Sequence, residues 1–144
     1  MTTKEKNRQK KYPNTDCFNW YNANPKGKIT GDCVIRAVCT GLDRPYLDVY
    51  KELFEHSIKT GYSLASKENF DGYLKSQGWI KQKQPRKLDN KKFTGKEFCA
   101  IVALPQERYI ADIGGHHLVA IVDCKVQDIW DSTRKCIGNY WVKG

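Results

Sequence analysis

The sequence predicts an α+β domain in which N-terminal helices pack on a C-terminal antiparallel sheet. Two observations indicate this class. The first half of the chain carries apolar residues at helical spacing between glycines, whereas the second half carries short β-branched and aromatic runs between turn residues. The 144 residues, 40% of them hydrophobic, are enough for one core but too few for two comfortable domains.

The N-terminal residues 1–14 are polar and cationic, and we expect them to form a basic, flexible arm. They contain no apolar segment of a secretory signal, and the chain has no apolar run of about 18 residues that could span a membrane. We therefore expect a cytoplasmic protein, in a bacterium or a host cell, whose six cysteines stay reduced. Residues 15–144 are the predicted domain, and they begin with an irregular, aromatic-rich stretch at 15–29.

Three helices are predicted after this stretch. The first, at 33–40, follows Asp32, which can serve as its N-cap. The second, at 45–60, has apolar residues at helical spacing and ends before Gly61. The third, at 67–77, is expected to place its aromatic residues on one face.

The rest of the chain predicts a sheet. Five short runs rich in β-branched and aromatic residues alternate with turn residues, which is typical of successive antiparallel strands. These runs are KEFCAIVALP (96–105), RYIADIG (108–114), HHLVAIVDC (116–124), KVQDIWDS (125–132) and GNYWVKG (138–144).

The net charge of +9 is concentrated in two segments. Residues 1–12 carry +4 and residues 75–96 carry +7, so the other 110 residues sum to −2. Such segments could contact a polyanion such as nucleic acid, or they could be solvated and keep the protein soluble. The second interpretation is favoured, because the segments have little aromatic interleaving and match no nucleic-acid motif.

One cysteine stands where a thiol becomes reactive. Cys33 opens the first predicted helix, directly after Gly31 and Asp32, and the free amides and dipole of a helix N-terminus lower a thiol's pKa. Its own N–H would face a developing oxyanion. Cys39, inside the same helix, has none of these advantages. The spacings of the cysteines are irregular and contain no C-x-x-C, so we expect no metal and no other cofactor.

A thiol nucleophile needs a base and a group that orients the base. His116 and His117 open an apolar strand after two glycines, and the following strand supplies Asp131 and Asp128. The residues alone leave the pairing open: the base is His116 or His117, the orienting carboxylate is Asp131, and Asp128 is held in reserve.

Strand register would decide between these pairs. A two-residue turn at 123–124 sets His116 opposite Asp131 and His117 opposite Trp130. A three-residue connection instead sets His117 opposite Asp131.

GDCVIRA at a helix start, HHLVAIVD on one strand and WDS at the end of the next together resemble the papain-like cysteine peptidase fold. The resemblance is closest to the small C39-like peptidase domains of bacteria and phages, and covers roughly residues 24–140. It implies Cys33 as nucleophile, His117 as base and Asp131 as orienting carboxylate. The family places a Gln before the cysteine as oxyanion donor, and here Asn24, or else Asn22, is the nearest amide.

The resemblance implies a thiol hydrolase that cleaves a peptide or isopeptide bond of a protein or peptide substrate through an acyl-thioester at Cys33. Two other functions remain open. One is a catalytically impaired binding module that uses 1–12 and 75–96 to hold an acidic protein or nucleic acid. The other is a thiol acyltransferase, which passes through the same thioester.

Overall fold

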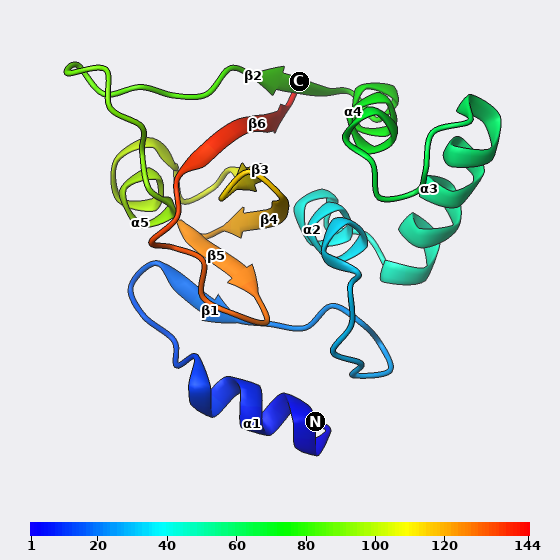
Figure 1. Ribbon diagram of the computed structural model, residues 1–144, viewed down its shortest axis with the longest axis horizontal. Helices are drawn as coiled ribbons and strands as arrows, with labels where there is room; N and C mark the ends of the chain where they lie inside the picture. The colour runs from blue at the N-terminus through cyan, green and yellow to red at the C-terminus, as the bar shows by residue number, and fades with distance from the viewer.

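The computed structural model describes residues 1–144 and confirms the α+β class, with five α-helices and a six-stranded mixed sheet (Figure 1). The α-helices are α1 (Thr3–Lys11), α2 (Cys33–Leu42), α3 (Tyr46–Thr60), α4 (Lys67–Ser76) and α5 (Gly95–Glu97), and a π-helix, η1 (Phe98–Val102), continues α5. The strands are β1 (Phe18–Trp20), β2 (Trp79–Gln82), β3 (Arg108–Ile113), β4 (His117–Val122), β5 (Lys125–Asp128) and β6 (Ile137–Lys143). No helix combines the length and the apolar character needed to cross a membrane.

The strand order is β1-β5-β4-β3-β6-β2. Five of the six strands pair antiparallel to one another, but β1 runs parallel to β5, with Phe18 beside Val126 and Trp20 beside Asp128. The prediction of a fully antiparallel sheet is therefore wrong at this edge. Both edge strands are short and lie outside the five predicted strand runs, because a short edge strand becomes visible only through its distant partner.

The turn between β4 and β5 has two residues, as in the tighter of the two predicted registers. Asp123 and Cys124 both have positive φ, at 55° and 59°, which is the backbone of a type I′ hairpin. Val122 pairs with Lys125, and Ala120 with Gln127. Because the strands are antiparallel, the first residue of β4 lies at the same end of the sheet as the last residue of β5.

Helices cover both faces of the sheet (Figure 1). On one face, α2, α3 and α4 enclose a core with Ile110, Leu118 and Trp141, and on the other face Phe98 and Cys99 of η1 pack on the sheet. Helix α2 lies very close to the sheet at a glycine, since a Cβ added at Gly41 would be 2.3 Å from Cγ1 of Ile110. This close packing fixes the position of α2, and with it Cys33, against the central strands.

The run KEFCAIVALP, predicted as a strand, is helical instead. Thr94 and Glu97 form a capping box, in which each side chain bonds the other's backbone N–H, and this starts α5. The apolar FCAIV that follows continues as the π-helix. A short apolar run does not by itself distinguish a buried strand from a buried helix, so the cap was the informative signal.

The predicted basic arm also has regular structure. Residues 3–11 form α1, which begins with a capping box between Thr2 and Glu5. Glu5 is buried and accepts a hydrogen bond from Nδ2 of Asn22, so it joins the helix to the segment that precedes α2. The N-terminal segment is therefore part of the folded body, a point that matters for the site below.

Candidate active site

Cys33 is the first residue of α2, as predicted, and is half-buried. The first amides of a helix have no partner within it, so the N–H of Cys33 is available to a ligand. Asp32 occupies the N-cap position but makes no capping hydrogen bond with its side chain. The prediction of Asp32 as the N-cap residue is therefore confirmed in position, but its carboxylate does not cap the helix and has other partners.

The imidazole of His117 comes from the first residue of β4 and lies against the last residue of β5. Its Nε2 is 2.5 Å from Oδ2 of Asp128, and the ring of Trp130 lies beside it with the centroids 4.8 Å apart. The side chains of His117 and Asp128 are 15% and 2% exposed, so water has little access to their contact. With Nε2 bound to Asp128, Nδ1 is the ring nitrogen left for the thiol.

Asp131, the predicted orienting carboxylate, lies elsewhere. Its Oδ1 accepts hydrogen bonds from the backbone N–H and the hydroxyl of Thr133, at 2.9 and 2.6 Å, and closes the turn that follows β5. Strand β5 ends at Asp128, so the predicted pairing of Asp131 with a histidine across two strands cannot form. The structure brings the reserve residue, Asp128, to His117 instead.

The register explains why Asp128 reaches the ring. Continued past Ala120 and Gln127, the pairing sets Trp130 opposite His117, which agrees with their ring contact. Asp128 is then a diagonal neighbour of His117, and diagonal pairs are within reach of long side chains. His116, the alternate base, is exposed in the loop between β3 and β4 and has no such partner.

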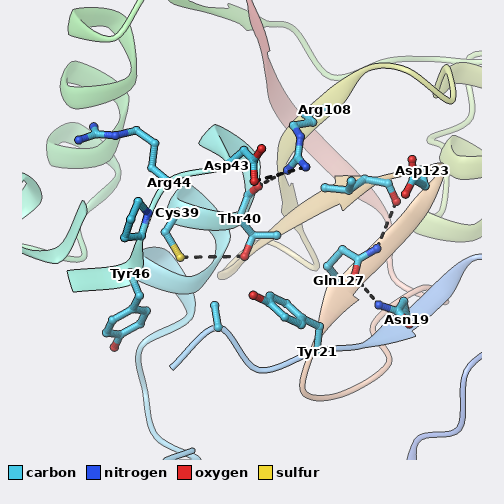
Figure 2. A pocket seen from close by; sticks show the side chains of 13 residues that line it. Asn19, Tyr21, Cys39, Thr40, Asp43, Arg44, Tyr46, Arg108, Asp123 and Gln127 are labelled. Atoms are coloured by element: carbon cyan, nitrogen blue, oxygen red, sulfur yellow. Dashed lines mark hydrogen bonds and ion pairs between the residues drawn. The ribbon is translucent and has the colours of Figure 1, made fainter. Parts of the chain in front are cut away.

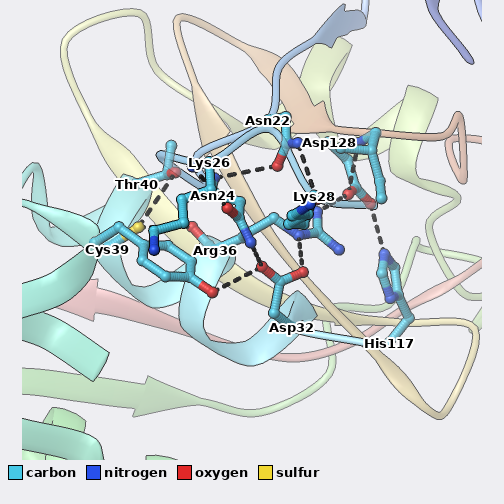
Figure 3. A network of polar contacts seen from close by, with 12 residues as sticks. Asn22, Asn24, Lys26, Lys28, Asp32, Arg36, Cys39, Thr40, His117 and Asp128 are labelled. Atoms are coloured by element: carbon cyan, nitrogen blue, oxygen red, sulfur yellow. Dashed lines mark hydrogen bonds and ion pairs between the residues drawn. The ribbon is translucent and has the colours of Figure 1, made fainter. Parts of the chain in front are cut away.

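A buried arginine connects the acidic residues of the site (Figure 3). The guanidinium of Arg36 donates from Nε to Oδ1 of Asp32 at 2.7 Å and from Nη1 to Oδ1 of Asp128 at 2.6 Å. The same Oδ1 of Asp128 accepts the N–H of Ile129 at 2.7 Å. One arginine on α2 therefore holds the carboxylate that contacts His117, and it also compensates the charge of Asp32 beside Cys33.

The predicted oxyanion donor, Asn24, is engaged in the same network. Its Nδ2 donates to Oδ2 of Asp32 at 3.1 Å, and the same oxygen accepts the hydroxyl of Tyr46 at 2.8 Å. Asn22, the other candidate, donates to Glu5 and to the carbonyl of Lys28. Both hydrogens of the Asn22 amide are engaged, and neither Asn22 nor Asn24 lines the surface beside Cys33, which leaves the backbone N–H of Cys33 as the donor at the thiol.

The pKa values of the thiol and the imidazole move in opposite directions. Burial alone would raise the pKa of Cys33, but its interactions with His117 and the positive charge of Arg36 bring that pKa below the ordinary value. Burial opposes the charged form of His117, yet Asp128 and Cys33 raise its pKa to about 9. The pair therefore favours a thiolate next to an imidazolium, which is the reactive state of a cysteine nucleophile.

Two buried cysteines, Cys39 and Cys99, behave differently. Burial raises the pKa of Cys39 to about 11 and that of Cys99 to about 12. Among these three thiols, only Cys33 contacts an imidazole. This contrast agrees with the expectation that Cys39, inside the helix, has no activating partner.

Two hollows in the surface meet at Cys33 and His117. The first, with a volume of about 390 Å³, extends past Trp130 to Arg8 and Tyr12 of the N-terminal segment, and we call it the α1 hollow. The second, of about 300 Å³, extends toward α4 and includes His116. An extended chain could lie in both hollows and cross the thiol between them.

The largest pocket lies elsewhere. It has a volume of about 440 Å³ and is lined by Asn19, Cys39, Arg44 and Arg108 among others (Figure 2). Its arginines are engaged, since Arg108 donates to the carbonyl of Thr40 at 2.6 Å and Arg44 is paired with Glu52. It contains no nucleophile beside a base, so the site is assigned to the two hollows. No group of three or more His, Cys, Asp or Glu side chains is arranged to hold a metal ion.

Sequence reasoning missed two residues of the site. Arg36 is the only charged residue of α2, in an otherwise apolar helix whose neighbours are buried, and an isolated charge of that kind signals a buried partner. The sequence alone does not distinguish Trp130 from a packing residue of the sheet, but Trp130 lies against the imidazole and lines the α1 hollow. No family model, no curated protein and no solved structure matches this chain.

Proposed function

We propose that the chain is a cysteine-dependent hydrolase of the papain-like class, similar to small C39-like peptidase domains, which cleaves a peptide or isopeptide bond. One observation carries this proposal. Cys33 at a helix start and the His117–Asp128 pair lie together where two hollows meet. The chain order of nucleophile, histidine and acid, on a helix and then on neighbouring strands, supports the papain-like assignment.

The acylation step uses the favoured charge state. The thiolate of Cys33 attacks the carbonyl carbon of the substrate, and the carbonyl oxygen becomes an oxyanion that the N–H of Cys33 can bind. The imidazolium of His117 donates a proton to the leaving nitrogen, and the C–N bond breaks. The products of this step are a free amine and an acyl-thioester on Cys33.

In deacylation, His117 acts as a base instead of an acid. The neutral imidazole of His117 takes a proton from water, and the hydroxide so formed attacks the thioester carbon. The C–S bond breaks, a carboxylic acid leaves and the thiolate and imidazolium are restored. Asp128 keeps the ring oriented through both steps, because its Oδ2 holds Nε2 while its Oδ1 is held by Arg36.

Alkylation by iodoacetamide tests whether Cys33 is an activated nucleophile. The readout is the alkylation rate of each cysteine near neutral pH, obtained by peptide mass spectrometry. Cys136 is the reference because it is exposed, whereas Cys33 is half-buried. Solvent access alone would therefore favour alkylation of Cys136. We expect Cys33 to react at least about tenfold faster than Cys136, because alkylation follows the thiolate fraction. The rapid phase should vanish in Cys33→Ala and persist in Cys136→Ala; equal rates at both sites would refute the proposal.

Trapping of the acyl group tests the reaction itself. A library of peptides is incubated with the protein in the presence of hydroxylamine, which intercepts a thioester as a hydroxamate. Hydrolysis predicts carboxylic acids without hydroxylamine and hydroxamates with it, in both cases only when Cys33 is present. Products in which the acyl group is joined to an amine of the library would instead assign acyl transfer. If no product forms, the hydrolase proposal fails and the binding module remains.

A further inference from the structure

Helix α1 forms part of the wall of the α1 hollow, the larger of the two beside Cys33. Arg8 of this helix and Tyr12 at its C-cap line the hollow together with Cys33 and His117. A third hollow, of about 420 Å³, shares Arg8 and Ile29 with the α1 hollow and continues along α1. The two form one groove that runs from the thiol along the N-terminal helix.

The helix is anchored to the body, so the groove is a fixed feature. Oε1 of Glu5 accepts the N–H of Thr2 at 2.9 Å, and Oε2 accepts Nδ2 of Asn22 at 3.1 Å. The hydroxyl of Thr2 donates to the carbonyl of Gly27, and Tyr12 packs against the core beneath the sheet. These contacts hold both ends of α1 in place.

The groove presents unpaired positive charge. Lys4, Arg8 and Lys11 line its outer part, and their spacing of four and three residues places them on one face of the helix. None of the three takes part in any of the seven ion pairs of the molecule. The one acidic residue of the helix, Glu5, is buried and already bonded to Thr2 and Asn22.

We propose that this groove selects substrates with acidic residues on one side of the bond that is cleaved. The inference deepens the proposed function and rests on it, because the groove begins at the thiol. A peptide fits this position better than a nucleic acid does, since it supplies both the carboxylates for α1 and the acyl carbon that a thiolate attacks. The segment at 1–12 is then a specificity element of the site.

The test measures how peptides protect Cys33 from iodoacetamide. Two peptides of equal length, one of alternating glycine and glutamate and one of alternating glycine and lysine, are titrated at low salt. We expect the acidic peptide to slow alkylation of Cys33 and the basic peptide to leave it unchanged. Because any thiol is alkylated in time, protection can be measured even if Cys33 proves no more reactive than Cys136, so the two proposals fail separately.

A matched pair of variants locates the effect. The double variant Lys4→Glu with Arg8→Glu reverses the charge of the groove. The double variant Lys6→Glu with Lys10→Glu makes the same change of net charge at exposed positions on the opposite face of α1. Because the groove variant replaces two attractive charge contacts by repulsive ones, we expect protection to weaken about tenfold in the groove variant only. Equal protection by both peptides, equal loss in both variants, or stronger protection by a single-stranded oligonucleotide would overturn the inference.

Discussion

Replacement of Asp128 by asparagine isolates the part of the site that the structure assigns to the carboxylate. The change keeps the size of the side chain and removes the charge that His117 Nε2 contacts at 2.5 Å. An amide does not stabilise an imidazolium as a carboxylate does. The thiolate of Cys33 depends on that imidazolium, so we expect the variant to lose reactivity at the thiol while Cys33 itself is untouched.

The magnitude follows from the elevated pKa of His117. Its value of about 9, against an ordinary 6.5, corresponds to about 3 kcal/mol in favour of the charged ring. Burial acts against that charge, and the hydrogen bond with Asp128 is the largest contribution that favours it. A loss of about one pKa unit from this contribution disfavours the thiolate–imidazolium pair relative to the neutral pair about tenfold, and the alkylation rate falls with it.

The assay is the pH profile of Cys33 alkylation by iodoacetamide. Wild type should react well below the pH at which an ordinary thiol does, and Asp128→Asn should move the profile to higher pH. Asp131→Asn is the matched control, since the Asp131 carboxylate accepts its hydrogen bonds from Thr133 and not from His117, and its profile should coincide with that of wild type. The reasoning is refuted if Asp128→Asn, shown to be folded by circular dichroism, has the wild-type profile, or if Asp131→Asn has the larger effect.

Two further predictions concern stability. A histidine whose pKa is raised on folding stabilises the protein fully below about 6.5 and loses that contribution as the pH rises through about 9. The lowered pKa of the Cys33 thiol contributes stability that grows as the pH rises, which offsets the loss from His117 in wild type. The free energy of unfolding in urea should therefore fall with pH in Cys33→Ala and change less in wild type. Equal slopes would contradict the coupling. Arg36→Met leaves two buried carboxylates without their cation and should cost about 3–5 kcal/mol in the same measurement, with partial recovery when Asp32→Asn is added. A loss below about 1 kcal/mol would show that the network is not needed for folding.

Three of the five α-helices could be predicted because their signals are local. Helices α2, α3 and α4 lie within two residues of the predicted ranges, since periodicity, caps and glycine stops act over a few neighbours. Strands β1 and β2 could not be predicted in the same way. Each is three or four residues long and pairs with a strand some sixty or more residues away in sequence.

The same distinction between local and long-range signals applies to the residues of the site. Cys33 and the His116/His117 doublet could be located from the sequence because a helix start and a strand start are each marked by adjacent residues, but the choice of His117 came only from the family resemblance. Their acidic partner depended on where β5 ends and on a diagonal contact across two strands, neither of which a sequence pattern specifies. The choice between Asp131 and Asp128 was therefore a question of tertiary geometry, as was the groove beside α1.

The contribution of Arg36 follows from counting buried charge. Asp32 and Asp128 are both at least nine-tenths buried and share the single guanidinium of Arg36, which leaves one negative charge without a fixed cation. A proton on His117 supplies that cation, which is why the ring resists the desolvation that would otherwise make it neutral. The carboxylate of Asp32 lies beside Cys33 and by itself would oppose a thiolate. Through Arg36 and Asp128, it is instead part of the group of charges that keeps the imidazolium in place. Because Arg36 and Cys33 lie on the same helix one turn apart, any movement of α2 would change the nucleophile and the support of its base together.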